Sequence, residues 1–205
     1  MKDLPDVLQT LLRDKVQVRP GTIAALPTQQ ADRLRSPLDL GRLLLSPLGK
    51  VPEPLLRFWL NHPRGVVVID SHRHEYVPGV QSVGRNNQHG VAWTSARAVL
   101  TGTDMLLPAA NLLDHLLGSD GVVDRPWLSD GAGRSEAWHL VGDRLKRQFE
   151  LGYGPESTSS DSHAYFAWGI DTYLSDRQIL NVADPGLERL LRTTLFDSRF
   201  VQKNL

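Results

Sequence analysis

An apolar stripe between Asp104 and Gly118 constrains the fold of this chain more than any other stretch. In the segment DMLLPAANLLDHLLG, apolar or small side chains recur at helical spacing, at Leu106, Ala109, Ala110, Leu113, Leu116 and Leu117. A helix with so apolar a surface has to lie in the middle of a fold. Its polar residues Asn111, Asp114 and His115 therefore need partners or a function. We expect Gly118 to end this helix in a left-handed conformation.

The composition excludes several classes of chemistry. The chain has 205 residues, enough for a substantial core, and no cysteine, which rules out disulfides, thiol catalysis and cysteine-ligated zinc. Its 23 basic and 23 acidic residues balance, so nothing indicates a general affinity for nucleic acid or acidic membranes. The start, MKDLPDVLQTLLRDK, alternates charges with leucines and is not a signal peptide, and no apolar run could span a bilayer. We therefore expect a cytoplasmic protein.

Residues 1–62 are rich in leucine and punctuated by proline, which indicates a helical N-terminal region packed on the domain that follows. Asp3 and Pro5 suit the N-cap and the first position of one helix. The pair Ser36-Pro37 opens another helix in the same way. Further helices are expected over residues 28–35 and 54–62.

Residues 63–205 differ in character and are expected to form an α+β domain with a small mixed or antiparallel sheet around the central apolar helix. GVVVID, residues 65–70, is a β-branched run typical of a buried strand, whereas SVGRNNQHG, residues 82–90, has the composition of a loop. We predict a second strand over VAWTSARAVL, residues 91–100, with alternate side chains on one face. Three more helices are expected to start at Ser135, at Asp161 or Ser162, and at Asp184-Pro185.

Three short segments resemble a known family of metallopeptidases. NLLDHLLGSDG, residues 111–121, is similar to the end of the active-site helix of the anthrax lethal factor-like gluzincins, which reads HExxHxLDHxxG. DSHAYFAWGIDTYL, residues 161–174, resembles the segment of that family that supplies the third zinc ligand. ILNVADPGLERLL, residues 179–191, resembles the helix that follows it. The resemblance covers about residues 65–200 and implies a zincin-like fold.

The same resemblance shows that the catalytic positions of the family are changed in this chain. The two zinc-binding histidines of the family correspond to Leu107 and Asn111, its general-base glutamate to Pro108 and its third ligand to Ala164. Leucine and alanine cannot bind a metal, proline cannot accept a proton, and a lone asparagine is a poor zinc ligand. The resemblance therefore implies a pseudo-metallopeptidase in which zinc is not expected. Because proline disrupts a helix interior, we also expect the helix to begin near Leu107 or to kink there.

A non-catalytic domain of this kind is expected to bind a protein or peptide, because the lethal factor family contains a degenerate copy of its protease domain that serves as a docking module. We expect the ligand to pair with an edge strand in a groove between residues 91–100 and helix 106–117, and the role to be regulatory or that of a scaffold in a bacterial protein. The candidate groove residues are Trp93, Ser95, Arg97, Asn111, Asp114, His115, His163, Tyr165 and Tyr173.

The alternative is a metal-dependent hydrolase with a relocated histidine site. His72 and His74 lie two residues apart and would share one face of a strand, and His115 could supply a third ligand. A site from His115, His163 and Asp114 is the other combination. Against both stand simpler interpretations: a polar hairpin tip at residues 72–74, and buried histidines bonded to a carbonyl or carboxylate. The partner, the oligomeric state and the independence of residues 1–62 are left open by the sequence.

One further group of charged residues is expected to be a solvent-exposed helix face. Arg144, Lys146 and Arg147 fall on the polar side of the helix expected after Ser135, so we expect them to be solvated.

Overall fold

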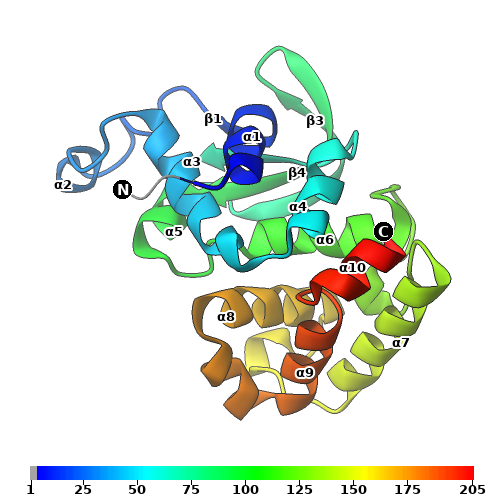
Figure 1. The fold of residues 1–205 in the computed structure, drawn as a ribbon. Coiled ribbons are helices and arrows are strands. Elements are labelled where there is room, and N and C mark those ends of the chain that lie inside the picture. The colour runs from blue at the N-terminus through cyan, green and yellow to red at the C-terminus, as the bar shows by residue number, and fades with distance from the viewer. Residues whose placement is uncertain (1–3) are drawn as a thin grey trace.

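The computed structural model describes residues 4–205, in which helices pack on the face of a four-stranded mixed sheet that carries Val67, Ile69 and Ala92 (Figure 1). The strand order is β1-β2-β4-β3; β1, β2 and β4 are parallel and β3 is antiparallel to β4. The α+β class and the small mixed sheet are therefore as expected. The strands are β1 (Val16–Val18), β2 (Val66–Asp70), β3 (Glu75–Val83) and β4 (Asn86–Ser95).

The N-terminal third is mostly helical, and its leucines join the common core rather than forming one of their own. Asp3 lies outside the described residues; the first helix begins at Asp6, with Pro5 at the N-cap position. Ser36 is the N-cap of the helix that Pro37 opens, as expected, and its backbone N–H donates to the Asp39 carboxylate at 3.0 Å. The helices are α1 (Asp6–Lys15), α2 (Thr28–Ala31), α3 (Pro37–Leu45), the 3-10 helix η1 (Ser46–Lys50) and α4 (Glu53–Asn61).

One element of this N-terminal region was not anticipated. Residues 16–18 form β1, which pairs with β2 in parallel register, Gln17 opposite Val68. Three residues are too few to show a strand pattern, so the sequence carries no signal for it. The N-terminal region therefore supplies one edge of the sheet.

Two predictions for the sheet were wrong. Residues 82–90, expected to be a loop, continue β3 and β4 on either side of a tight turn, with Val83 paired to Asn86. Backbone pairing holds this hairpin, so its polar side chains do not exclude it. The strand expected over 91–100 ends at Ser95, whose hydroxyl accepts a hydrogen bond from the N–H of Ala98 and caps helix α5 (Ala96–Thr101).

The central apolar helix is α6 (Leu107–Ser119), which packs against β3, β4 and α8 (Figure 1). It begins at Leu107 as predicted, which places Pro108 in the first turn, where a missing N–H has no cost. Gly118 does not end the helix; Asp120 does, with φ of 53°. Gly118 is needed because a Cβ there would lie 2.3 Å from the backbone nitrogen of Leu128.

The C-terminal helices form a second layer beneath α6 in the view of Figure 1. Helix α8 begins at Ser162 as predicted, and its N-cap Asp161 accepts hydrogen bonds from two backbone N–H groups. No helix of the described residues has both the length and the apolarity needed to cross a membrane. The remaining elements are the 3-10 helices η2 (Leu128–Asp130) and η3 (Glu156–Thr158), and the helices α7 (Glu136–Glu150), α8 (Ser162–Ala183), α9 (Pro185–Thr193) and α10 (Ser198–Asn204).

Candidate functional site

The four residues at the changed catalytic positions of the resemblance line one pocket of about 400 Å³. Leu107, Pro108 and Asn111 come from the first turns of α6, and Ala164 comes from the first turn of α8. We call this space the α6 pocket. The rest of its lining is His74, Glu75, Asp104, Ser157, Thr158, Ala167 and Trp168.

Local structure explains why these residues meet. Leu107 and Asn111 lie four residues apart, so they share one face of α6. Ala164 is fixed opposite because Asp161 caps α8 through the N–H groups of His163 and Ala164, at 2.9 and 3.2 Å. The residues that lead into β3 close the third side. The pocket therefore lies at the junction of two helices and the outer strand of the sheet.

The side chains at these positions do not fit a zinc ion. Those of Leu107, Pro108 and Ala164 contain only carbon, and the amide of Asn111 is the one group among the four with a donor or acceptor atom. The Oδ1 atom of Asn111 is buried and has no hydrogen-bond partner among residues 4–205. Within residues 4–205, no three histidine, aspartate or glutamate side chains converge in a way that could hold a metal.

His115 lies behind the pocket and is fully buried. Its Nδ1 accepts a hydrogen bond from the hydroxyl of Tyr76 at 2.8 Å, and its Nε2–H donates to the carbonyl of Val122 at 2.8 Å. Burial lowers the pKa of His115, which keeps the ring neutral. The simpler of the two interpretations, a buried and satisfied histidine, is therefore the one that the structure shows.

Asp114 is also fully buried, one turn beyond Asn111. Its carboxylate accepts hydrogen bonds from the backbone N–H of Ser129 at 2.8 Å and from the hydroxyl of the same residue at 2.6 Å. Burial raises the pKa of Asp114 to about 7, although these two hydrogen bonds oppose the shift. The group thus ties α6 to η2.

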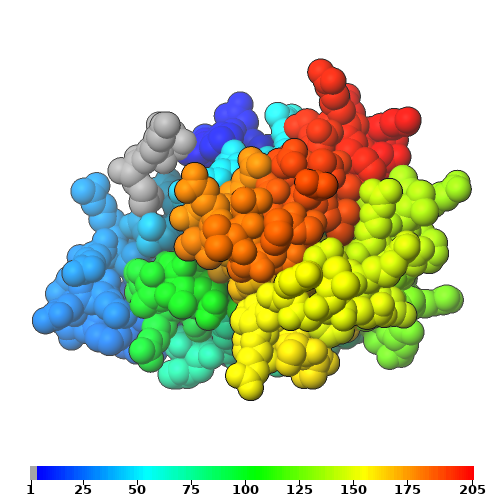
Figure 2. Space-filling view, turned by 90° about the horizontal axis from the view of Figure 1, so that it is seen from below, coloured from blue at the N-terminus to red at the C-terminus, as the bar shows by residue number. Residues whose placement is uncertain are grey.

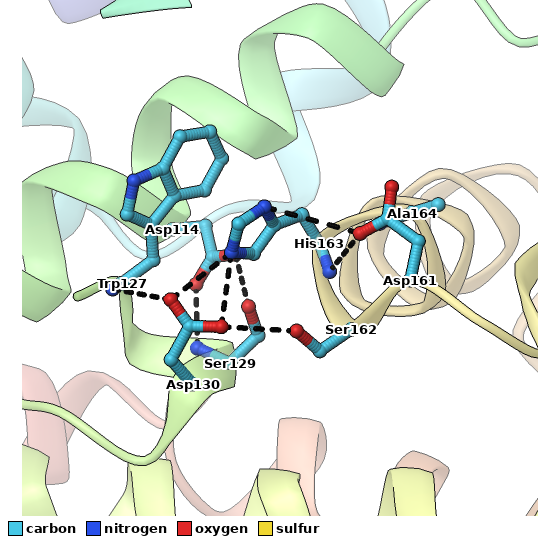
Figure 3. Close-up of polar contacts among 8 residues, drawn as sticks. All are labelled: Asp114, Trp127, Ser129, Asp130, Asp161, Ser162, His163 and Ala164. Carbon is cyan, nitrogen blue, oxygen red and sulfur yellow. Dashed lines mark hydrogen bonds and ion pairs between the residues drawn. The ribbon is translucent and has the colours of Figure 1, made fainter. Parts of the chain in front are cut away.

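His163 and Asp130 form a polar cluster next to Ala164 (Figure 3). The Nε2 atom of His163 lies 3.0 and 3.1 Å from the two carboxylate oxygens of Asp130. Asp130 also accepts hydrogen bonds from the N–H of Trp127 at 2.9 Å and from the hydroxyl of Ser162 at 3.1 Å. Burial alone would raise the pKa of Asp130, but these hydrogen bonds outweigh it and hold the pKa below its usual value.

The indole of Trp127 joins this cluster to the buried histidine. It stacks on His163 with ring centroids 3.9 Å apart and on His115 at 4.9 Å. Trp127, Ser129 and Asp130 belong to the segment of residues 118–133, which has no hydrophobic period from which its structure could be predicted. The one available signal was an aromatic residue followed by acids in a stretch of glycines, which does not identify a site.

Several of the predicted groove residues lie elsewhere. Trp93 faces the opposite side of the sheet from α6, in a cluster with Val66, Val68 and Val91, and the Arg73 guanidinium lies 4.0 Å from its ring centroid. Alternation along β4 explains this, because Ala92 belongs to the core cluster that contains α6. The prediction that Trp93 lines a groove between residues 91–100 and helix 106–117 was therefore wrong. β4 is also a central strand, so it offers no free edge; β3 does.

The other predicted residues have structural roles. Arg97 is exposed on α5, and Ser95 caps the same helix. The Tyr165 hydroxyl donates to the buried carboxylate of Asp184. Tyr173 stacks on Phe196 with centroids 4.1 Å apart. Of the nine candidates, only Asn111 lines the α6 pocket, with His163 beside it.

The histidines proposed as a relocated metal site do not converge either. The Nε2–H of His74 donates to the carbonyl of Asp104 at 3.0 Å, and its Nδ1 accepts from the N–H of Ser95 at 3.3 Å. Both ring nitrogens of His115 are engaged as described above. His72 is exposed, and only its backbone N–H is fixed, by Asp70.

We compared the chain with protein families, curated proteins and solved structures. No family model, no curated protein and no solved structure matches this chain.

Proposed function

We propose that this chain is a non-catalytic, zincin-like binding module whose ligand is a peptide segment of a partner protein, with a regulatory or scaffold role. The observation that carries the proposal is the α6 pocket: the four positions singled out by the resemblance meet around one space, and their side chains suit contact rather than catalysis.

The binding mode that fits this geometry is strand addition. β3 is the outer strand next to the pocket, and Glu75, its first residue, lines that pocket. An outer strand presents unpaired N–H and C=O groups along its free edge, to which an extended peptide can bind. A register shift between Val77 and Val80, a stretch that contains Pro78, confines the regular pairing of β3 with β4 to the two ends of β3. A side chain of the bound peptide would then enter the α6 pocket.

Filling the pocket tests the proposal. Peptides selected for binding from a displayed library should lose affinity at least about tenfold for Ala164→Phe, because the new ring occupies the space between α6 and α8. Ala183→Phe is the matched control: it is the same substitution at an exposed position, in the helical segment that follows the kink of α8 at Asp176. Equal affinity of both variants would contradict binding in this pocket.

The alternative, a hydrolase with a relocated histidine site, is not favoured by the geometry because protein groups already engage the ring nitrogens of His74 and His115. Zinc titration followed by calorimetry distinguishes the two. One zinc ion bound per chain, and lost on His115→Ala, would establish the alternative.

A further inference from the structure

A second hollow, of about 570 Å³, lies between the second half of α7 and the length of α9 and shares no lining residue with the α6 pocket. We call it the α7–α9 groove. Leu151, with 62% of its surface exposed, and Leu190 give it an apolar part. Figure 2 shows this side of the molecule, where the orange residues of α8 and α9 lie beside the yellow residues that follow α7.

Three arginines line the groove: Arg144, Arg147 and Arg189. All three are exposed, and no ion pair found among residues 4–205 includes any of them. Glu150 is the single acidic residue in the lining. Arg192, which lies on α9 as Arg189 does, is by contrast paired with the buried Glu188. The groove therefore combines an excess of unpaired positive charge with an apolar surface.

The two walls are held in fixed relation. The side-chain amide of Gln148 on α7 donates to Asp184 Oδ1 at 2.8 Å, and the same oxygen caps α9 by accepting from the N–H of Leu187 at 2.8 Å. A Cβ at Gly186 would lie 2.5 Å from the side-chain amide of Gln148, so this amide lies directly against the start of α9. A groove fixed in this way does not have to be ordered on binding.

We propose that the α7–α9 groove binds an acidic segment of a partner protein that carries carboxylates for the arginines and an apolar side chain for Leu151 and Leu190. Charge complementarity identifies the occupant: guanidinium groups pair with carboxylates in a bidentate way, and arginine is favoured at protein interfaces. The apolar part favours a peptide over a small inorganic anion. The balanced charge of the whole chain gives no support for nucleic acid.

A labelled peptide of alternating glutamate and leucine is the probe, measured by fluorescence anisotropy with the full-length chain. We expect saturable binding that weakens as salt is added. The double variant Arg144→Gln/Arg189→Gln should weaken binding about tenfold, and Leu151→Ser should weaken it several-fold. Arg85→Gln, in the exposed turn between β3 and β4, is the control and should bind as the wild type does.

Four outcomes would overturn the proposal. They are no saturation up to about millimolar peptide, equal binding of a glutamine–leucine peptide, unchanged affinity in the double variant, and full displacement by inorganic phosphate or an oligonucleotide. Circular dichroism and a thermal melt check that each variant is folded, and the single variant Arg189→Gln serves if the double variant is not. The Ala164→Phe variant should bind this probe normally, which separates failure here from failure at the α6 pocket.

Discussion

The imidazole of His163 lies flat against the indole of Trp127, with centroids 3.9 Å apart and ring planes 16° from parallel. The same imidazole bonds to the Asp130 carboxylate, whose other partners include the backbone of Trp127 (Figure 3). One histidine at the start of α8 thus fixes the segment between α6 and α7. This contact holds the C-terminal helices next to the α6 pocket.

Removing the His163 ring should therefore destabilise the fold. His163→Ala loses the stacked pair and one hydrogen bond to Asp130, and we expect a loss of about 1–2 kcal/mol in the free energy of unfolding. His163→Phe keeps a stacked ring without the hydrogen bond, so its free energy of unfolding should lie between those of the wild type and His163→Ala. Urea unfolding measures the effect, and His139→Ala, exposed on α7, is the control. If His163→Ala were as stable as that control, the stacked pair would not contribute to the stability of the fold.

Asp114 predicts a pH dependence with the opposite sign from a surface carboxylate. Its pKa is about 7 in the folded protein, above the ordinary value of about 3.9 that applies to the unfolded chain. Between pH 4 and 7 the folded state therefore holds a proton that the unfolded state has released. Stability falls as the pH rises through that range, by at most about 1.4 kcal/mol per pH unit from this group.

Asp114→Asn isolates this contribution. Asparagine stays neutral, so the difference in unfolding free energy between wild type and variant should change between pH 4 and 7 in favour of the variant. Using the difference removes the titration of the histidines, which occurs in the same range. Urea unfolding at several pH values supplies the measurement. A difference independent of pH would contradict the raised pKa.

The close approach at Gly118 gives a prediction about packing. In Gly118→Ala the new Cβ would meet the backbone of Trp127 and Leu128 at 2.3 to 2.6 Å, and backbone cannot move aside as a flexible side chain does. We expect a loss of about 1–3 kcal/mol or more. Gly49→Ala is the matched control, because no atom of the described part of the chain lies within 4 Å of a Cβ there. Thermal unfolding of both variants checks the contrast.

The sequence predicted the elements whose signals are local. Short patterns were enough to predict three of them: the apolar period over 106–117, the Ser36 cap and the Asp-Pro start of α9. It failed where the determining contact is distant in the chain. The hairpin over 82–90 is held by backbone pairing, and Trp93 faces away from α6 because of the register of β4. The role of Trp127 and Asp130 depends on their contacts with His163, which is more than 30 residues away in the sequence.

The last prediction tests whether positions 107, 111 and 164 retain the geometry that the resemblance implies. The triple variant Leu107→His/Asn111→His/Ala164→Glu would restore two histidines four residues apart on α6 and a carboxylate on α8, all directed at the α6 pocket. We expect it to bind one zinc ion with a dissociation constant of about micromolar or tighter, by calorimetry, and to unfold at a higher temperature when zinc is present.

The control for that experiment keeps both histidines and moves the carboxylate. Leu107→His/Asn111→His/Ala183→Glu has the same composition, but its glutamate lies at the exposed end of α8. Two histidines alone should bind zinc at least about tenfold more weakly than three converging ligands. Equal affinities would show that Ala164 does not face α6 at ligand distance. The zincin-like interpretation of the pocket, and the pseudo-metallopeptidase proposal with it, would then be wrong.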